Sequence, residues 1–284
     1  MDNRDNENWD LIIEPKTGWF NLHLGDVWGC RDLIGLFVKR DFVTFYKQTI
    51  LGPLWYIIQP IFNTIVFTII FGKIAKIPTD GIPPFLFYLS GNVVWGYFAH
   101  CLTGTSNTFV SNAGIFGKVY FPRISVPISV VITGVFQFII QFMIFLGFYF
   151  YFMINGSDLN PSFLILLLPL LIFQMAILGL GMGTLISALT TKYRDLTFAM
   201  GFCVQLWMYL TPIVYPLSQV PERYRIIYVF NPMASIVELF RAAFLGINTV
   251  EPLHIAISIG MTVIIFLTGI MLFNKIEKTF MDTV

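Results

Sequence analysis

Hydrophobic and polar positions alternate along this chain in long blocks. Six uncharged stretches come close to or exceed about 20 residues, the length that crosses the hydrocarbon core of a bilayer as a helix. They are residues 50–71, 85–102, 126–154, 163–189, 198–215 and 253–273. The blocks predict an all-α integral membrane protein with six transmembrane helices.

A seventh apolar segment, 226–245, has features that an ordinary span lacks. Asn231-Pro232 interrupts it, and it carries Glu238 and Arg241. Each charge costs roughly 2.5 to 3.5 kcal/mol near the centre of a membrane helix. We therefore interpret the segment as a re-entrant or interfacial helical hairpin. Because Glu238 and Arg241 are three residues apart, one helical face would hold both and let them pair.

The basic residues favour a cytosolic N-terminus. With six spans, this orientation places 12 of the 17 Lys and Arg residues on cytosolic segments, in agreement with the positive-inside rule. Both termini would then be cytosolic. Counting 226–245 as a span would lower that number to 10, which leaves seven spans as a weaker, open alternative.

The segment before the first span predicts an amphipathic helix over 31–49. Apolar and charged residues are interspersed there, and Asp32 lies near the helix start, so the helix would rest in the cytosolic membrane interface. Its candidate interface residues are Lys39, Arg40, Phe42 and Tyr46. The chain would then divide into a cytosolic segment (1–30), this helix, and a transmembrane domain (50–284) with a cytosolic connector (107–125) and an outer connector (216–251).

Composition excludes a water-soluble single domain. The chain is 56% hydrophobic and 12% charged, with a mean hydropathy of +0.76, whereas soluble domains are about 25% charged. The net charge of +1 gives no global field toward nucleic acid. Three widely spaced cysteines imply no disulfide framework.

Catalytic patterns are missing from the sequence. Gly117-Lys118 lacks the other residues of a phosphate-binding loop, so the chain should not hydrolyse ATP by itself. The three histidines lie in unrelated segments, and no metal site or bound cofactor is expected. A membrane glycosyl- or acyltransferase would need clustered acids or histidines. An ion channel or secondary transporter would usually place ionisable groups inside its spans.

Small and polar residues inside the spans indicate helix contacts. Gly179 and Gly183 form G-x-x-x-G, which predicts close helix packing. Thr133, Gln137 and Gln141 share one helical face in the third span. Their polar groups would form interhelical hydrogen bonds or, less favoured, line a pore.

Aromatic residues are abundant in the first and fifth spans. Some belong to the interfacial belt of any membrane protein. Others could line a conduit, where rings stack weakly against sugar C–H faces and let a polymer slide. The candidate conduit residues are Trp55, Tyr56, Phe62, Phe67, Trp207 and Tyr209.

The cytosolic connector 107–125 predicts a short helix that ends near Pro122. Such a helix would present Lys118, Tyr120 and Arg123 to the cytosol. An ordinary loop is one interpretation. A docking element for a partner is the other, because aromatic residues and Arg are enriched at interface hot spots.

Several motifs together resemble a known family. They are RDLIGLFVKRDFVTFYKQTILGPLWYIIQP (31–60), YLSGNVVWGYF (88–98), KVYFPRISVPIS (118–129), KYRDL (192–196) and SQVPERYRIIYVFNPMASIVELFRAAFLG (218–246). In order, over nearly the whole chain, these are similar to the permease subunit of type-2 ATP-binding-cassette polysaccharide exporters.

The resemblance implies an assembly and a mechanism. It implies a homodimer in the bacterial inner membrane with two copies of a separate ATPase, which would bind the ATP and Mg. The cargo would be an undecaprenyl-linked polysaccharide, O-antigen or teichoic acid, although related permeases export drugs. The first and fifth spans would line the conduit, with the outer connector at its exit. The residues that would couple to the ATPase are Lys118, Val119, Tyr120, Phe121, Pro122 and Arg123.

Overall fold

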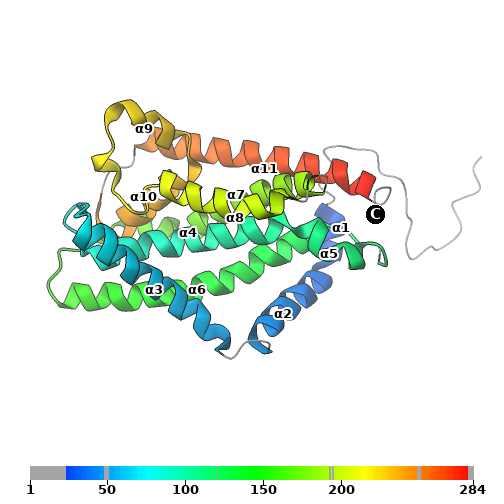
Figure 1. Cartoon of the computed structure of the whole chain (residues 1–284), viewed down its shortest axis with the longest axis horizontal. Coiled ribbons are helices and arrows are strands. Elements are labelled where there is room, and N and C mark those ends of the chain that lie inside the picture. The colour runs from blue at the N-terminus through cyan, green and yellow to red at the C-terminus, as the bar shows by residue number, and fades with distance from the viewer. Residues whose placement is uncertain are drawn as a thin grey trace, which may run out of the picture.

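A computed structural model describes residues 24–47, 51–119, 121–191, 193, 195–247 and 251–280 (Figure 1). This part of the chain is a bundle of α-helices with no β-strand. The helices are α1 (Leu24–Gly29), α2 (Arg31–Lys47), α3 (Trp55–Phe67), α4 (Pro84–Ser106), α5 (Thr108–Phe116), α6 (Ser125–Ile154), α7 (Leu168–Thr190), α8 (Leu196–Leu210), α9 (Glu222–Val229), α10 (Pro232–Leu245) and α11 (Pro252–Phe280). A π-helical turn, Thr68–Ile74, extends α3, and a 3-10 turn, Phe163–Leu167, precedes α7.

Four helical segments are long and apolar enough to cross a membrane. They have 20, 30, 28 and 26 residues and are Trp55–Ile74, Ser125–Ile154, Phe163–Thr190 and Pro252–Glu277. The stretches predicted at 85–102 and 198–215 also form helices, α4 and α8, but α4 is less apolar and α8 has 15 residues. The chain is therefore a multi-pass, all-α membrane protein.

The predicted span 198–215 was too long at its C-terminal end. Helix α8 ends at Leu210, and Thr211 takes an extended conformation with φ of −102° and ψ of 142°. Pro212 explains the difference, because proline pushes the preceding residue out of the helical region and cannot donate the next hydrogen bond.

Helix α4 forms the centre of the bundle. It packs against α3, α6, α7, α8 and α10, and most of its residues are buried. Its threonine hydroxyls donate to carbonyls of their own helix: Thr103 to Ala99 and Thr105 to Cys101. These two threonines are therefore tolerated inside the bundle, because each finds an acceptor within its own helix.

Glycines bring α7 close to both of its neighbours. A Cβ added at Gly179 would lie 2.5 Å from the Cβ of Cys101 in α4, and one added at Gly183 would overlap the Thr105 side chain. On the other side, a Cβ added at Gly181 would lie 2.5 Å from the Cα of Phe266 in α11. The close packing predicted from G-x-x-x-G is confirmed.

The outer connector contains a sharply bent helical pair. Helices α9 and α10 meet at 100°. Asn231 caps α10, since its side chain accepts from the Met233 amide, and Pro232 takes the first turn, where its missing N–H costs nothing. The break predicted at Asn231-Pro232 is confirmed. Gly246 ends α10 at a φ of 77°.

The bent pair stays at one end of the bundle. The Ser258 hydroxyl near the start of α11 donates to the Pro232 carbonyl, and the Ser162 amide before α7 donates to the Ala243 carbonyl. Both ends of α10 are thereby tied to segments at the same end. Helices α1 and α5 and the C-terminal part of α11 lie at the opposite end (Figure 1).

Candidate functional site

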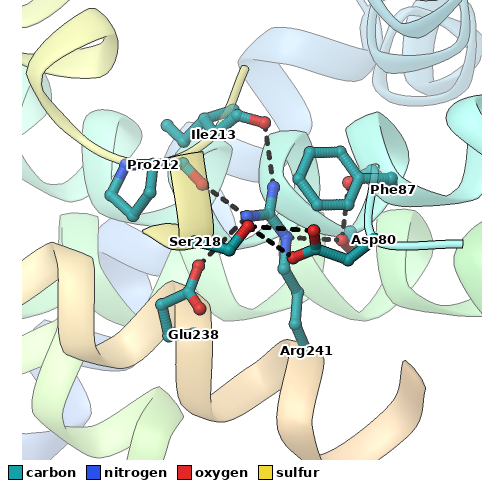
Figure 2. Close-up of polar contacts among 8 residues, drawn as sticks. Asp80, Phe87, Pro212, Ile213, Ser218, Glu238 and Arg241 are labelled. Atoms are coloured by element: carbon teal, nitrogen blue, oxygen red, sulfur yellow. Dashed lines mark hydrogen bonds and ion pairs between the residues drawn. The ribbon is translucent and has the colours of Figure 1, made fainter. Parts of the chain in front are cut away.

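A fully buried arginine organises the end of the bundle that holds α10. Arg241 is 0% exposed and Glu238 3%. The Arg241 guanidinium lies 3.7 Å from the centroid of the Phe87 ring. It donates hydrogen bonds to Glu238 Oε1 at 3.3 Å, the Ile213 carbonyl at 2.8 Å, the Ser90 hydroxyl at 3.4 Å and the Pro212 carbonyl (Figure 2).

These contacts explain how a charge can be buried there. An isolated ion is costly to remove from water, and the cost falls only when its donors meet acceptors. The spacing in sequence identified Glu238 as a partner of Arg241, and the structure pairs them. The carbonyls of Pro212 and Ile213 lie 29 and 28 residues away, so only the fold could bring them to Arg241.

An exposed contact links two loops beside this cluster. The Ser218 hydroxyl lies 2.9 and 3.1 Å from the two carboxylate oxygens of Asp80 (Figure 2). Asp80 belongs to the loop between α3 and α4, and Ser218 to the outer connector. The loop after α3 is thereby joined to the connector that follows α8.

Asn231 fastens the end of α8 to the start of α10. Its amide nitrogen donates to the Leu210 carbonyl at 3.3 Å and to the Thr211 hydroxyl at 3.0 Å. Its amide oxygen accepts from the Trp207 indole at 3.1 Å. One side chain therefore holds three groups at the C-terminal end of α8.

The six candidate conduit aromatics do not share one environment. Trp55, Phe62 and Tyr209 are exposed, at 44%, 63% and 41%. Tyr56 is half-buried, and Phe67 packs against the rings of Phe71 and Tyr88. Trp207 is also partly buried, with its ring centroid 5.0 Å from that of Phe98 and 6.2 Å from that of Trp95.

Helices α3 and α8 leave apolar faces uncovered. Both pack on α4, yet α3 has two buried residues, Pro60 and Thr64, and α8 has one, Val204. Trp55, Phe62 and Tyr209 lie on these open faces. The arrangement keeps three of the six aromatics available for a lipid, a second copy or a cargo.

The polar row in α6 behaves differently from the expectation. The Thr133 hydroxyl donates to the Ser129 carbonyl of its own helix. Gln141 is buried against Gly96 of α4, where a Cβ would lie 3.1 Å from Gln141 Oε1. Within the described chain, neither Gln137 Oε1 nor Gln141 Oε1 has a hydrogen-bond partner. The expected interhelical hydrogen bonds to these two oxygens are therefore not formed.

The helix in the connector 107–125 is shorter than predicted. Helix α5 ends at Phe116, and the turn from Gly117 follows, where the prediction extended the helix to near Pro122. Of the six candidate coupling residues, Lys118 and Val119 are exposed, Pro122 is half-buried, Phe121 is buried, and Tyr120 lies outside the described residues.

Arg123 is not presented outward, as the sequence suggested. It is 9% exposed, and its guanidinium donates to the Glu277 carbonyl in α11 and lies 5.6 Å from the Phe116 ring centroid. Its amide donates to Glu277 Oε1 at 3.4 Å. Carbonyls at a helix C-terminus attract a cation, and this attraction draws Arg123 inward. No sequence pattern marked Glu277 as its partner.

One aromatic cluster unites the elements at this end. The ring of Phe109 in α5 stacks on Phe273 of α11 with centroids 4.6 Å apart, and Phe121 contacts Phe37 of α2 at 5.6 Å. Phe116 and Val126 complete the buried set. The connector, α2 and α11 therefore pack as one unit.

Helix α2 spans Arg31–Lys47, within the predicted range 31–49. Helix α1 precedes it, in the segment 1–30 for which no helix was predicted. Helix α2 packs on α6. Lys39 and Arg40 are exposed, and Arg40 Nη2 lies 2.8 Å from Asp41 Oδ1. The Phe42 ring faces Phe136 of α6 at 6.2 Å. The side chain of Tyr46 lies outside the described residues.

No metal-binding group is formed in the described parts of the chain, where no three His, Cys, Asp or Glu side chains come together suitably.

Comparison with protein families identifies this architecture. The model of the ABC-2 type transporter family matches residues 32–245, most of the chain. The chain belongs to the ABC-2 type transporter family. The match begins in α2 and ends with the last residue of α10, so it contains nearly all of α2, the connector with Lys118 and the Arg241 cluster.

Curated ABC-2 relatives align along most of their length. An O-antigen export system permease protein, RfbA, of Klebsiella pneumoniae is 28% identical over 254 residues, 88% of this chain and 94% of that protein. RfbA of Myxococcus xanthus is 26% identical over 218 residues, 75% and 80% of the two chains. The polysialic acid transport protein KpsM of Escherichia coli is 21% identical over 249 residues, 86% and 93%. The relatives are transport proteins.

Proposed function

We propose that the chain is the membrane-spanning subunit of an ATP-driven exporter that moves a lipid-linked polysaccharide out of the cytosol. The alignment with O-antigen export permeases at 26% and 28% identity carries the proposal. O-antigen is the favoured cargo, since the polysialic acid transporter aligns at 21%. Teichoic acid is the next candidate.

The proposed topology has six spans in the bacterial inner membrane with both termini in the cytosol. The spans are α3 with its π-helical turn, α4, α6, α7 with its 3-10 turn, α8 and α11. Helix α4 can be less apolar than its neighbours because they shield it from lipid. The bent α9–α10 pair would be re-entrant, since hydrogen bonds tie both ends of α10 to one end of the bundle.

The proposed conduit forms between two copies of the chain. The open faces of α3 and α8 support this, because exposed Trp55, Phe62 and Tyr209 would offer rings to a passing glycan. The inward contacts of Phe67 and Trp207 favour a packing role for these two residues. A conduit built from weak stacking contacts binds loosely enough to release a long polymer.

The energy would come from two copies of a separate ATPase that bind ATP and Mg. Lys118 and Val119 are exposed at the tip of the connector and would contact the ATPase. Arg123, bonded to Glu277, would hold the connector in place. The phenylalanine cluster would transmit its movement to α2 and α11.

Substitutions at the connector should separate contact from support. Lys118→Glu and Val119→Asp should weaken co-purification with the ATPase while the melting temperature of the permease stays unchanged, because both side chains are exposed. Arg123→Ala should lower both, because it removes the guanidinium and its hydrogen bond to the Glu277 carbonyl. Lys76→Glu, at the other end of the bundle, is the control. Normal ATPase capture by both tip variants would contradict the docking assignment.

Loss of the gene in its own bacterium tests the cargo. Cells lacking the permease should carry no surface O-antigen and should accumulate the lipid-linked polymer at the cytosolic face. A plasmid copy should restore export only when the partner ATPase can hydrolyse ATP. Normal surface polysaccharide together with altered resistance to small hydrophobic compounds would instead assign a drug-type cargo.

A further inference from the structure

Helix α8 is held by side-chain hydrogen bonds at one end, whereas the rest of the helix packs on the bundle through one face and leaves the other exposed. Phe198 and Phe202, in the N-terminal half of α8, are 89% and 64% exposed, and Val204 is the one buried residue of this helix. The side-chain hydrogen bonds that join α8 to other parts of the described chain involve Trp207, Tyr209 and Leu210, all in its last turn.

The chain becomes fully buried immediately after α8. Thr211 and Ile213 are 0% exposed and Val214 is 2% exposed. Burial therefore rises sharply from the largely exposed α8 to the segment 211–214, which we call the anchor. A displacement of α8 would break fewer contacts than a displacement of the anchor.

Two polar side chains from the outer connector hold the anchor in place. The last carbonyls of a helix lack partners within the helix and need donors when they are buried. Asn231 donates to the Leu210 carbonyl, and Arg241 donates to the carbonyls of Pro212 and Ile213. The positive charge of Arg241 also suits the negative end of the α8 dipole.

We propose that Asn231 and Arg241 are positioning residues that fix the exit end of α8 and make it the pivot of this helix during transport. This inference rests on the proposed function, which makes α8 a wall of the conduit. The cytosolic part of α8 would swing while the exit end stays against the connector. The conduit would therefore open and close from its cytosolic side.

The size of the motion follows from helix geometry. With a rise of about 1.5 Å per residue, Phe198 lies about 16 Å along α8 from Tyr209. A tilt of about 15° around the exit end would move Phe198 by about 4 Å and Tyr209 by less than about 1 Å. The difference between these two positions is the signature of the pivot.

Spin labels at these two positions test the pivot in the complex with its ATPase. Exposed Cys203 and partly exposed Cys30 would first be replaced by Ser, whereas Cys101 is buried. A label at Phe198→Cys or at Tyr209→Cys reports the distance between the two copies of the permease, with and without ATP. The distance should change by several ångströms at position 198 and hardly at all at position 209.

The outcomes separate the pivot from the assembly. Equal changes at both positions, a larger change at 209, or no change at either position while export proceeds would overturn the pivot. A missing label–label signal at both positions would contradict the two-copy assembly itself, and with it the pivot.

Asn231→Ala gives a second, functional readout. The variant should still assemble with the ATPase and hydrolyse ATP, but export should fall several-fold, and position 209 should now move as much as position 198. Asn155→Ala is the matched control, because the Asn155 amide bonds to the Tyr151 carbonyl of its own helix. Unchanged export and an immobile position 209 in Asn231→Ala would overturn the role of Asn231.

Discussion

Replacing Arg241 by alanine should lower the free energy of unfolding by about 3–5 kcal/mol. The change would leave the Glu238 carboxylate buried with its cation removed and deprive the carbonyls of Pro212 and Ile213 of their donor. Unpaired buried charges and carbonyls are expensive because no water replaces the lost contacts. Denaturant titration of the purified permease in detergent measures the effect.

Two further variants make the Arg241 test specific. Arg223→Ala removes an exposed arginine in α9 that rests on the Tyr224 ring, and should change stability by less than about 0.5 kcal/mol. Combining Arg241→Met with Glu238→Leu should recover part of the loss, because both charges leave together. If Arg241→Ala were as stable as Arg223→Ala, the buried contacts of Arg241 would not stabilise the end of the bundle that holds α10.

Replacing Gly269 by alanine should separate α11 from α7. The added Cβ would overlap the Gly181 carbonyl oxygen and lie 2.9 Å from the Thr184 hydroxyl oxygen. Helix α7 cannot yield easily, since Gly179 and Gly183 already seat it against α4. Overpacking of this kind typically costs about 1–3 kcal/mol, so the melting temperature and the yield of folded permease should both fall.

Gly260→Ala is the matched control for Gly269→Ala. It lies in the same helix, and a Cβ there meets nothing within 4 Å. Alanine favours a helix over glycine by up to about 1 kcal/mol, so this variant should be as stable as the native chain or slightly more stable. Equal stability of both alanine variants would show that α7 and α11 are not in close contact at Gly269.

The local sequence rules succeeded where one short pattern settles the structure. Asn231-Pro232 breaks the helix because asparagine caps and proline starts one. The spacing of Gly179 and Gly183 places both on one face of α7, where neighbouring backbone can approach. Glu238 and Arg241 face each other because three residues make about one helical turn.

The same rules failed where a distant segment supplies the partner. Arg123 was expected at the surface, but Glu277 in α11 and the Phe116 ring draw it inward. The sequence also contained no sign that Asn231 accepts the indole N–H of Trp207. These partners lie 154 and 24 residues away, and no periodic pattern connects residues so far apart.

By itself, the sequence determined the membrane class, the helical content and the break in the outer connector. These features depend on hydrophobic length and on residues within a turn of each other, which act before any helix meets another. Only the tertiary structure decided which polar groups are buried and which residues are their hydrogen-bond partners. Arg241 reaches the carbonyls after α8 because α10, α4 and that segment converge. A buried charge is stable only where the fold brings hydrogen-bond acceptors from several segments into contact with it.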